Sequence, residues 1–126
     1  RLSNSILETA VLKKPENFDY QFALWNSYYE TAGLLSFTGD SRAALEESRK
    51  ALTLAEKLQT VAPERKENRT MQTLSRTITA VNLAETGDYE NALDNSLQVF
   101  RVFSKDYENE PNNPLRRYEM FAVNFR

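Results

Sequence analysis

Carboxylate side chains are the first candidates for acid–base catalysis or metal binding in this 126-residue sequence, because it contains neither histidine nor cysteine. Glu46 and Glu47 are neighbours, but adjacent residues of a helix diverge by about 100° and do not share a face. Asp19, Glu108 and Glu110 likewise have no second carboxylate on a shared buried face. Glycine-rich phosphate loops, nucleophile elbows and metal-binding spacings are missing from the sequence. We therefore expect these carboxylates to lie in solvent, and we predict a non-enzymatic chain without cofactor or metal.

Basic residues cluster at the start of two predicted helices. The cluster comprises Arg65, Lys66, Arg69, Arg116 and Arg117. A separation of 48 residues relates Arg69 to Arg117, so the two groups could form one basic edge that binds an anion or an acidic peptide. Cations at the start of a helix interact unfavourably with its dipole, so their presence there favours a functional role over chance. The alternative is that they are solvated and pair with nearby glutamates, namely Glu64, Glu67 and Glu119.

Aromatic residues are concentrated in one short segment. They are Phe18, Tyr20, Phe22, Trp25, Tyr28 and Tyr29. Aromatic side chains are enriched at protein interfaces, but the spacing of Phe22, Trp25 and Tyr29 by three and four residues indicates the core-facing side of a helix. Tyr20 and Tyr28 cannot fully share that face, so the sequence leaves open whether they are buried or exposed.

The overall charge argues against nucleic acid as a partner. Sixteen Lys and Arg face eighteen Asp and Glu, which gives a net charge of −2 and a pI near 5.3, so no basic excess exists to neutralise phosphates. The apolar stretches are too short for a membrane span, and no signal peptide is visible. Because the sequence starts at Arg1 inside a helical pattern, we interpret it as a fragment of a longer protein, and we expect a cytoplasmic location.

An internal repeat of 48 residues organises the sequence. It relates Pro15 to Pro63 and Pro111, and Gly39 to Gly87. Between residues 27 and 48, identical residues recur 48 positions later at Ser27, Thr31, Ala32, Leu35, Thr38, Gly39, Asp40, Ala44, Leu45 and Ser48. This density of identities is well above chance for a helical chain of biased composition.

Each 48-residue unit predicts two helices joined by a Gly-Asp turn. Gly39 and Gly87 are expected to end the first helices in a left-handed conformation, and Asp40 to cap the next helix. Pro63 ends the second helix of the first unit, because proline cannot continue the hydrogen-bond ladder. Each helix is expected to bury one stripe of residues spaced three and four apart. In the first unit the stripe of the first helix is Phe18, Phe22, Trp25, Tyr29, Ala32 and Leu35, and that of the second helix is Leu45, Ser48, Leu52, Ala55 and Leu58. Those in the second unit are Met71, Leu74, Ile78 and Val81, then Leu93, Leu97, Phe100, Phe103 and Tyr107.

These units predict a single all-helical domain of six helical segments. Residues 1–14 form the end of a preceding unit, 15–62 the first unit, 63–110 the second, and 111–126 the first helix of a further unit. The last helix is expected to start at Asn113-Pro114 and to carry an apolar stripe of Leu115, Tyr118, Phe121, Ala122 and Phe125. Since no partner helix follows it, we predict that a second copy or further residues cover this stripe, most simply in a homodimer.

The Gly-Asp turn followed by a helix that begins x-x-x-Ala-Leu resembles the core of a tetratricopeptide repeat (TPR). The matching stretches are residues 35–45 and 83–93. The family's small residues at close helix crossings correspond to Ala32, Ala80, Ala44 and Ala92, with Ala51 and Val99 at a third place. The family's early aromatic residue corresponds to Tyr28 in one unit but to Arg76 in the other. The closing proline matches Pro63 and Pro111.

The period of 48 residues departs from the family norm of about 34. Both helices of each unit are longer, which resembles the repeats that follow the kinase domain of some bacterial serine/threonine protein kinases. No kinase motif occurs in this sequence. The resemblance implies an all-α fold: a right-handed superhelix, or α-solenoid, of antiparallel helix pairs.

In TPR proteins the first helices of the units line a concave groove. The corresponding residues here are Asn26, Tyr29, Gly33, Ser36 and Phe37, then Leu74, Thr77, Val81, Ala84 and Glu85. The Lys and Asn clamp by which some family members hold a peptide carboxylate is replaced by Tyr29, Gly33 and Ile78, so a neutral groove would suit an apolar or mixed peptide. The resemblance implies a scaffold module that binds a peptide or helix of a partner protein. The alternative is a sensor module that binds a small ligand and controls an attached catalytic domain, such as a serine/threonine kinase.

Overall fold

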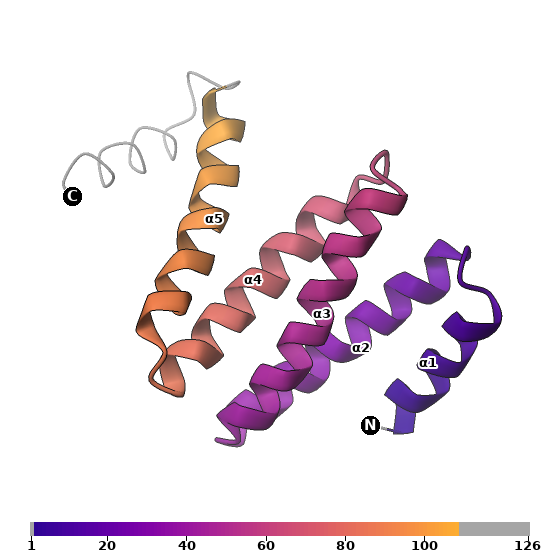
Figure 1. Ribbon diagram of the computed structural model, residues 1–126, viewed down its shortest axis with the longest axis horizontal. Helices are drawn as coiled ribbons and strands as arrows, with labels where there is room; N and C mark the ends of the chain where they lie inside the picture. The colour runs from indigo at the N-terminus through magenta and orange to yellow at the C-terminus, as the bar shows by residue number, and fades with distance from the viewer. Residues whose placement is uncertain (1, 109–126) are drawn as a thin grey trace.

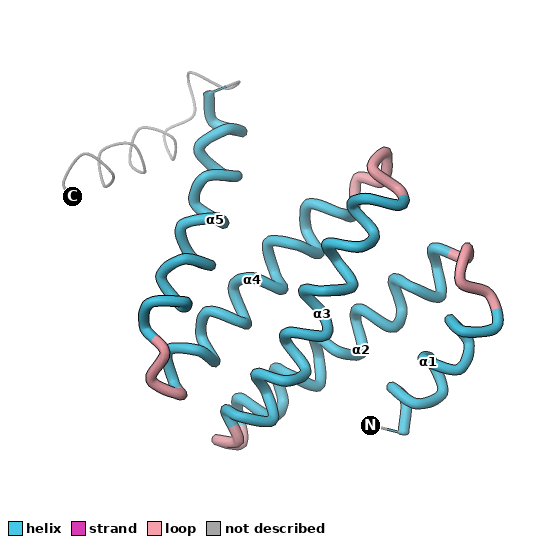
Figure 2. Tube along the Cα trace, viewed as in Figure 1, coloured by secondary structure: helices cyan, strands magenta, loops and turns pink. Residues whose placement is uncertain are grey.

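A computed structural model describes residues 2–108, and these residues form helices without any strand. The helices are α1 (Leu2–Lys13), α2 (Phe18–Phe37), α3 (Ser41–Val61), α4 (Glu67–Glu85) and α5 (Tyr89–Glu108). Figure 1 shows that consecutive helices reverse direction, so α2 and α4 run the same way, and Figure 2 shows the short connections between them. The all-helical prediction is therefore confirmed for this part of the chain. The helix predicted from residue 113 onwards, and the dimer expected through it, lie outside the described residues.

Two identical turns join α2 to α3 and α4 to α5. Gly39 and Gly87 have φ values of 89° and 93°, a left-handed conformation that glycine adopts without a Cβ penalty. In the first turn the N–H of Asp40 donates to the carbonyl oxygen of Leu35 at 2.9 Å, and the equivalent bond of the second turn is 2.8 Å long. The predicted Gly-Asp turns are confirmed.

Side-chain caps fix the start of three helices. The carboxylate of Asp40 accepts a hydrogen bond from the N–H of Ala43, and that of Asp88 accepts one from the N–H of Asn91, both at 3.3 Å. Asn17 caps α2 in the same way. Helix α4 differs, because Lys66 stands at its N-cap position and makes no side-chain capping bond. The start of α4 therefore keeps more of its positive end charge unneutralised.

The core lies between α2, α3 and α4. It comprises Leu24, Trp25 and Tyr28 of α2, Ala51, Leu54, Ala55 and Leu58 of α3, and Met71 of α4. Helix α4 packs against both α2 and α3, whereas α5 packs against α4 and no other described helix. The buried small residues Ala32, Ala44, Ala80 and Ala92 occupy the places expected for close helix crossings.

The buried face of α2 differs from the predicted stripe. Trp25 and Ala32 are buried as expected, but Phe22 and Tyr29 are only half-buried, and Tyr28 is buried in their place. Tyr20 is exposed. Phe18, Phe22, Trp25 and Tyr29 form a row of neighbouring rings. Trp25 belongs to the core, and the other three rings are partly buried against it.

The buried face of α4 is largely polar, and here the predicted stripe is wrong in part. Met71 is buried, but Leu74 and Ile78 are half-buried and Val81 is exposed. The buried positions are instead Asn68, Met71, Ser75, Thr79, Ala80, Asn82 and Leu83. The reason is that α4 packs against α2, α3 and α5, where small side chains allow close approach and hydroxyl groups can find partners inside the protein.

Candidate functional site: an α4–α5 crevice and a basic cavity

The ten predicted groove residues all lie at the protein surface. On α2, Asn26, Tyr29, Gly33 and Ser36 are half-buried and Phe37 is exposed. On α4, Leu74 and Ala84 are half-buried, whereas Thr77, Val81 and Glu85 are exposed. None of them is fully buried in the core, although Tyr29 and Leu74 pack against it.

Three of the predicted groove residues face α5 across a cavity of about 460 Å³. We call this cavity the α4–α5 crevice. Its lining residues are Thr77, Ala80, Val81 and Ala84 of α4, and Ala92, Leu93, Ser96 and Val99 of α5. The lining is small and apolar, and it contains no charged side chain. Of the other predicted groove residues on α4, Leu74 and Glu85 lie outside the crevice.

The corresponding surface of the first unit is covered. Forty-eight residues before Ser96 and Val99 stand Ser48 and Ala51, and both are completely buried. Ser96, in contrast, is exposed and Val99 is half-buried. The difference has a direct cause: α4 packs against α2 and α3, but no described helix packs in the same way against α4 and α5. Leu93, which lines the crevice, is 51% exposed.

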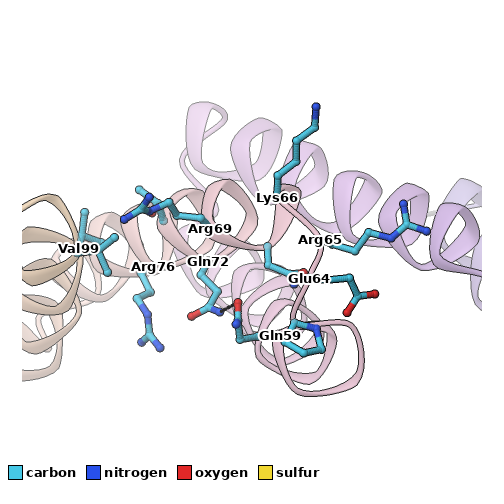
Figure 3. A pocket seen from close by; sticks show the side chains of 12 residues that line it. Gln59, Glu64, Arg65, Lys66, Arg69, Gln72, Arg76 and Val99 are labelled. Carbon is cyan, nitrogen blue, oxygen red and sulfur yellow. Dashed lines mark hydrogen bonds between the residues drawn. The ribbon is translucent and has the colours of Figure 1, made fainter. Parts of the chain in front are cut away.

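A second cavity, of about 500 Å³, lies where the end of α3, the α3–α4 connection, the first half of α4 and part of α5 meet. We call it the basic cavity, and Figure 3 shows it. Four cations line it together with one carboxylate, Glu64. The cations are Arg65, Lys66, Arg69 and Arg76. The first three belong to the predicted basic edge, and Arg76 joins them; Arg116 and Arg117 lie outside the described residues.

The four cations point in different directions (Figure 3). Lys66 points away from the cavity, and the guanidinium of Arg65 lies 4.4 Å from the centre of the Phe18 ring in α2. Arg69 and Arg76 leave α4 near Val99 of α5.

Arg76 is partly buried, with a side chain that is 17% exposed, and it has a carboxylate beside it. Its Nη2 lies 4.0 Å from Oε2 of Glu56, which is largely exposed, so solvent screens this pair. In the lining of the cavity, Nε2 of Gln72 donates a hydrogen bond of 3.1 Å to Oε1 of Gln59, which connects α4 to α3 (Figure 3). Arg76 was not among the predicted site residues, because the repeat assigned it to a structural aromatic position. The available signal was its place on the same face of the helix as Arg69, seven residues earlier.

A buried amide anchors the loop beside the basic cavity. Nδ2 of Asn68 donates to the carbonyl oxygen of Ala62 at 2.6 Å, and Gln21 makes the same kind of bond to Pro15 at the start of α2. Neither amide oxygen has a hydrogen-bond partner among the described residues. Both amides hold the chain that leads into the first helix of a unit.

The described part of the chain contains no group of three or more Asp and Glu side chains that could hold a metal ion. Glu46 and Asp19 are exposed as expected, but the expectation is wrong for Glu47, which is buried. Glu47 accepts a hydrogen bond from Asn4 at 3.2 Å and pairs with Lys50 at 3.3 Å. Its role is to tie α1 to α3.

Among the described residues, Tyr28 is the titratable group whose pKa is shifted most. Burial, and then the hydrogen bond that its hydroxyl donates to Glu8 at 2.9 Å, raise the pKa of Tyr28 above its ordinary value. The amino group of Lys50 lies 5.7 Å from the centre of the same ring. Since a tyrosine held neutral in this way neither gives up nor accepts a proton near neutral pH, the group serves packing between α1, α2 and α3.

Comparison with protein-family models, with curated proteins and with solved structures finds no match to this chain. Within residues 2–108, no helix is both long and apolar enough to cross a membrane.

Proposed function

We propose that this chain is a protein-interaction module of the TPR type, and that it accepts a helical segment of a partner protein in the α4–α5 crevice. The observation that carries the proposal is the difference between the two units. The surface formed by α2 and α3 is covered by α4, whereas the equivalent surface formed by α4 and α5 is covered by no described helix.

The proposal follows from how α4 is bound within the chain. Helix α4 presents small and polar residues such as Ser75 and Thr79 to the α2–α3 pair. A helix with a stripe of small and apolar side chains would find a similar surface on the α4–α5 pair, because Ala80 and Ala92 allow close approach there. Val81 and Leu93, which are 43% and 51% exposed, would be buried by it.

The chemistry of the crevice supports a role in binding and not in catalysis. Its lining offers hydroxyl groups of Thr77 and Ser96 but no titratable side chain. The chain also lacks histidine and cysteine, the commonest general base and the most reactive nucleophile. A scaffold role is consistent with these features.

A library of helical peptides, randomised along one stripe and selected against the immobilised chain of residues 1–126, tests the proposal. We expect selected peptides to bind the chain and to lose about tenfold or more in affinity when Leu93→Glu places a charge in the crevice. The matched control is Leu12→Glu, since Leu12 is exposed on α1 and lies outside the crevice. Failure to select any binder, or equal binding to Leu93→Glu, would contradict the proposal.

A further inference from the structure

The row of aromatic side chains on α2 has no counterpart on α4. The repeat of 48 residues holds for these two helices in the structure, because α2 ends at Phe37 and α4 ends at Glu85. The aromatic row of α2 consists of Phe18, Phe22, Trp25 and Tyr29. The residues 48 positions later are Lys66, Thr70, Thr73 and Thr77. Threonine therefore replaces most of the rings on the first helix of the second unit.

Trp25 fills the junction between α2 and α4 in the first unit. It is 3% exposed, and it belongs to the same core cluster as Ala51 of α3 and Met71 of α4. Its indole N–H donates a hydrogen bond to Ser75 of α4. At this junction the receiving helix α2 supplies the large side chain, and the helix that packs on it supplies a small one.

The equivalent place in the second unit is open. Thr73, 48 positions after Trp25, is half-buried and lines the basic cavity of about 500 Å³. Thr77, 48 positions after Tyr29, is exposed and lines the α4–α5 crevice of about 460 Å³. Val99 lines both cavities and lies on the side of α5 that faces α4 (Figure 3). Neither lining contains an aromatic side chain. A helix bound to the α4–α5 pair therefore meets open space where α4 meets an indole ring.

The hydroxyl group of Thr77 is arranged to accept a hydrogen bond. It donates its own proton to the carbonyl oxygen of Thr73 at 2.8 Å. The hydroxyl oxygen keeps lone pairs that can accept from a donor, and the exposed position lets a bound helix reach it. The indole N–H of tryptophan is a donor of this kind, and it is the group that Ser75 accepts in the first unit.

We propose, on the basis of the function proposed above, that the partner helix carries one tryptophan, which packs against Thr73, Thr77 and Val99 and donates its indole N–H to the hydroxyl of Thr77. This contact is the Trp25–Ser75 contact with the large and the small residue exchanged between the two helices. It continues the packing of α4 on the α2–α3 pair onto the next pair of helices. Aromatic side chains buried in such places carry much of the binding energy of protein interfaces.

The sequence limits where this tryptophan can come from. Trp25 is the one tryptophan among residues 1–126, and it is buried in the core. Neither residues 109–126 nor a second copy of this chain can therefore supply the side chain. The occupant is a helix of a partner protein, and the rest of its stripe is small and apolar because Ala80 and Ala92 allow close approach further along the crevice.

The peptide library described above also tests this inference. We expect peptides selected against the chain to share a tryptophan at one fixed position of the stripe, and to lose about tenfold or more in affinity when it is changed to alanine. Replacement by phenylalanine should cost less, because a ring remains and only the hydrogen bond is lost. Selected peptides that bind in the crevice without a shared aromatic position would overturn the inference, and the proposed function would stand.

Thr77→Val separates the hydrogen bond from the packing, because valine is β-branched like threonine but has no hydroxyl group. It should weaken the tryptophan peptide about two- to tenfold and leave its phenylalanine version unchanged. Thr60→Val is the matched control. Thr60 is exposed on α3, lines neither cavity, and donates its hydroxyl proton to the carbonyl oxygen of Glu56. If Thr77→Val affects the two peptides alike, the proposed contact is wrong.

Thr73→Trp places at this position the ring that Trp25 provides in the first unit. Circular dichroism and the melting temperature establish that the variant is folded before binding is measured, and Thr77→Val decides the matter if it is not. We expect a loss of about tenfold for tryptophan peptides, because two rings would overpack one place, and a selection against the variant should favour Ser or Ala there. Thr60→Trp adds the same ring outside both cavities as the control.

The outcomes separate this inference from the function on which it rests. If folded Thr73→Trp and Thr60→Trp bind tryptophan peptides equally well, the inference is wrong and the proposed function stands. If no peptide binds in the crevice at all, the proposed function itself fails.

Discussion

The indole N–H of Trp25 in α2 donates a hydrogen bond of 2.7 Å to the hydroxyl oxygen of Ser75 in α4. Both residues are buried, and they lie in different units of the repeat. The bond joins the first helices of the two units directly, so it helps to set how α4 lies across the α2–α3 pair. The orientation of the α4–α5 crevice depends on the same contact.

Removal of this hydroxyl should destabilise the protein. We expect Ser75→Ala to lower the free energy of unfolding by about 1–3 kcal/mol, because the buried indole N–H loses its acceptor. Urea denaturation measures the change. Ser96→Ala, at an exposed position of α5, is the matched control and should change stability by less than about 0.5 kcal/mol. Equal effects of the two substitutions would show that the bond contributes nothing.

The two glycines Gly87 and Gly33 should respond in opposite ways to alanine. A Cβ at either position would meet no atom within 4 Å, so any difference comes from the backbone. Gly87→Ala should cost about 1–2 kcal/mol, because Gly87 has a φ of 93°. Gly33→Ala, inside α2, should instead stabilise the protein by about 0.5–1 kcal/mol, because alanine favours a helix. Thermal unfolding of both variants checks the signs, and a stabilised Gly87→Ala would contradict the left-handed turn.

The local features of this fold can be predicted from sequence because their causes are local. Gly39 and Asp40 determine a turn through their own backbone and side chain, whatever lies around them. The small residues at helix crossings, such as Ala44, can be recognised for a related reason: only a small side chain allows two helices to approach closely. These local features were sufficient to predict the helices and the helical hairpins.

The exposed and buried faces of α4 could not be predicted in this way. Its apolar residues Leu74, Ile78 and Val81 form a regular stripe, yet Ser75 is the residue that is buried, because its hydroxyl accepts a hydrogen bond from Trp25. Trp25 is fifty residues away in the sequence, so no local pattern indicates this contact. The same limit applies to the candidate site. Arg76 belongs to the basic cavity only because α5 lies against this side of α4, a relationship that no local pattern of residues contains.

Overpacking of the helix crossings should be costly. Ala44 is completely buried beneath neighbouring helices, and Ala92 is 8% exposed. We expect Ala44→Leu and Ala92→Leu each to lower the free energy of unfolding by about 1–3 kcal/mol, with the larger loss at Ala44. Glu46→Leu, an exposed position on α3, is the control and should change stability little. A neutral Ala44→Leu would mean that the helices do not approach closely at this position.

Stability at high pH should depend on Tyr28. Its pKa is raised in the folded protein by burial and by the hydrogen bond to Glu8, whereas in the unfolded chain it titrates near its ordinary value of about 10. The folded state therefore holds this proton more tightly than the unfolded state. The stabilisation is fully present below about pH 10 and is lost as the pH rises toward the folded pKa.

Because lysines also titrate in this range, the informative quantity is the difference between the wild-type chain and Tyr28→Phe. At pH 8 the variant should be less stable by about 1 kcal/mol, since it loses the hydrogen bond to Glu8. Above pH 10 this difference should shrink, because only the wild-type protein must keep a tyrosine neutral in order to fold. Chemical denaturation at pH 8, 9.5 and 10.5 measures the trend. A difference that stays constant would show that Tyr28 titrates alike in the folded and unfolded states, and one that grows would show that folding lowers its pKa.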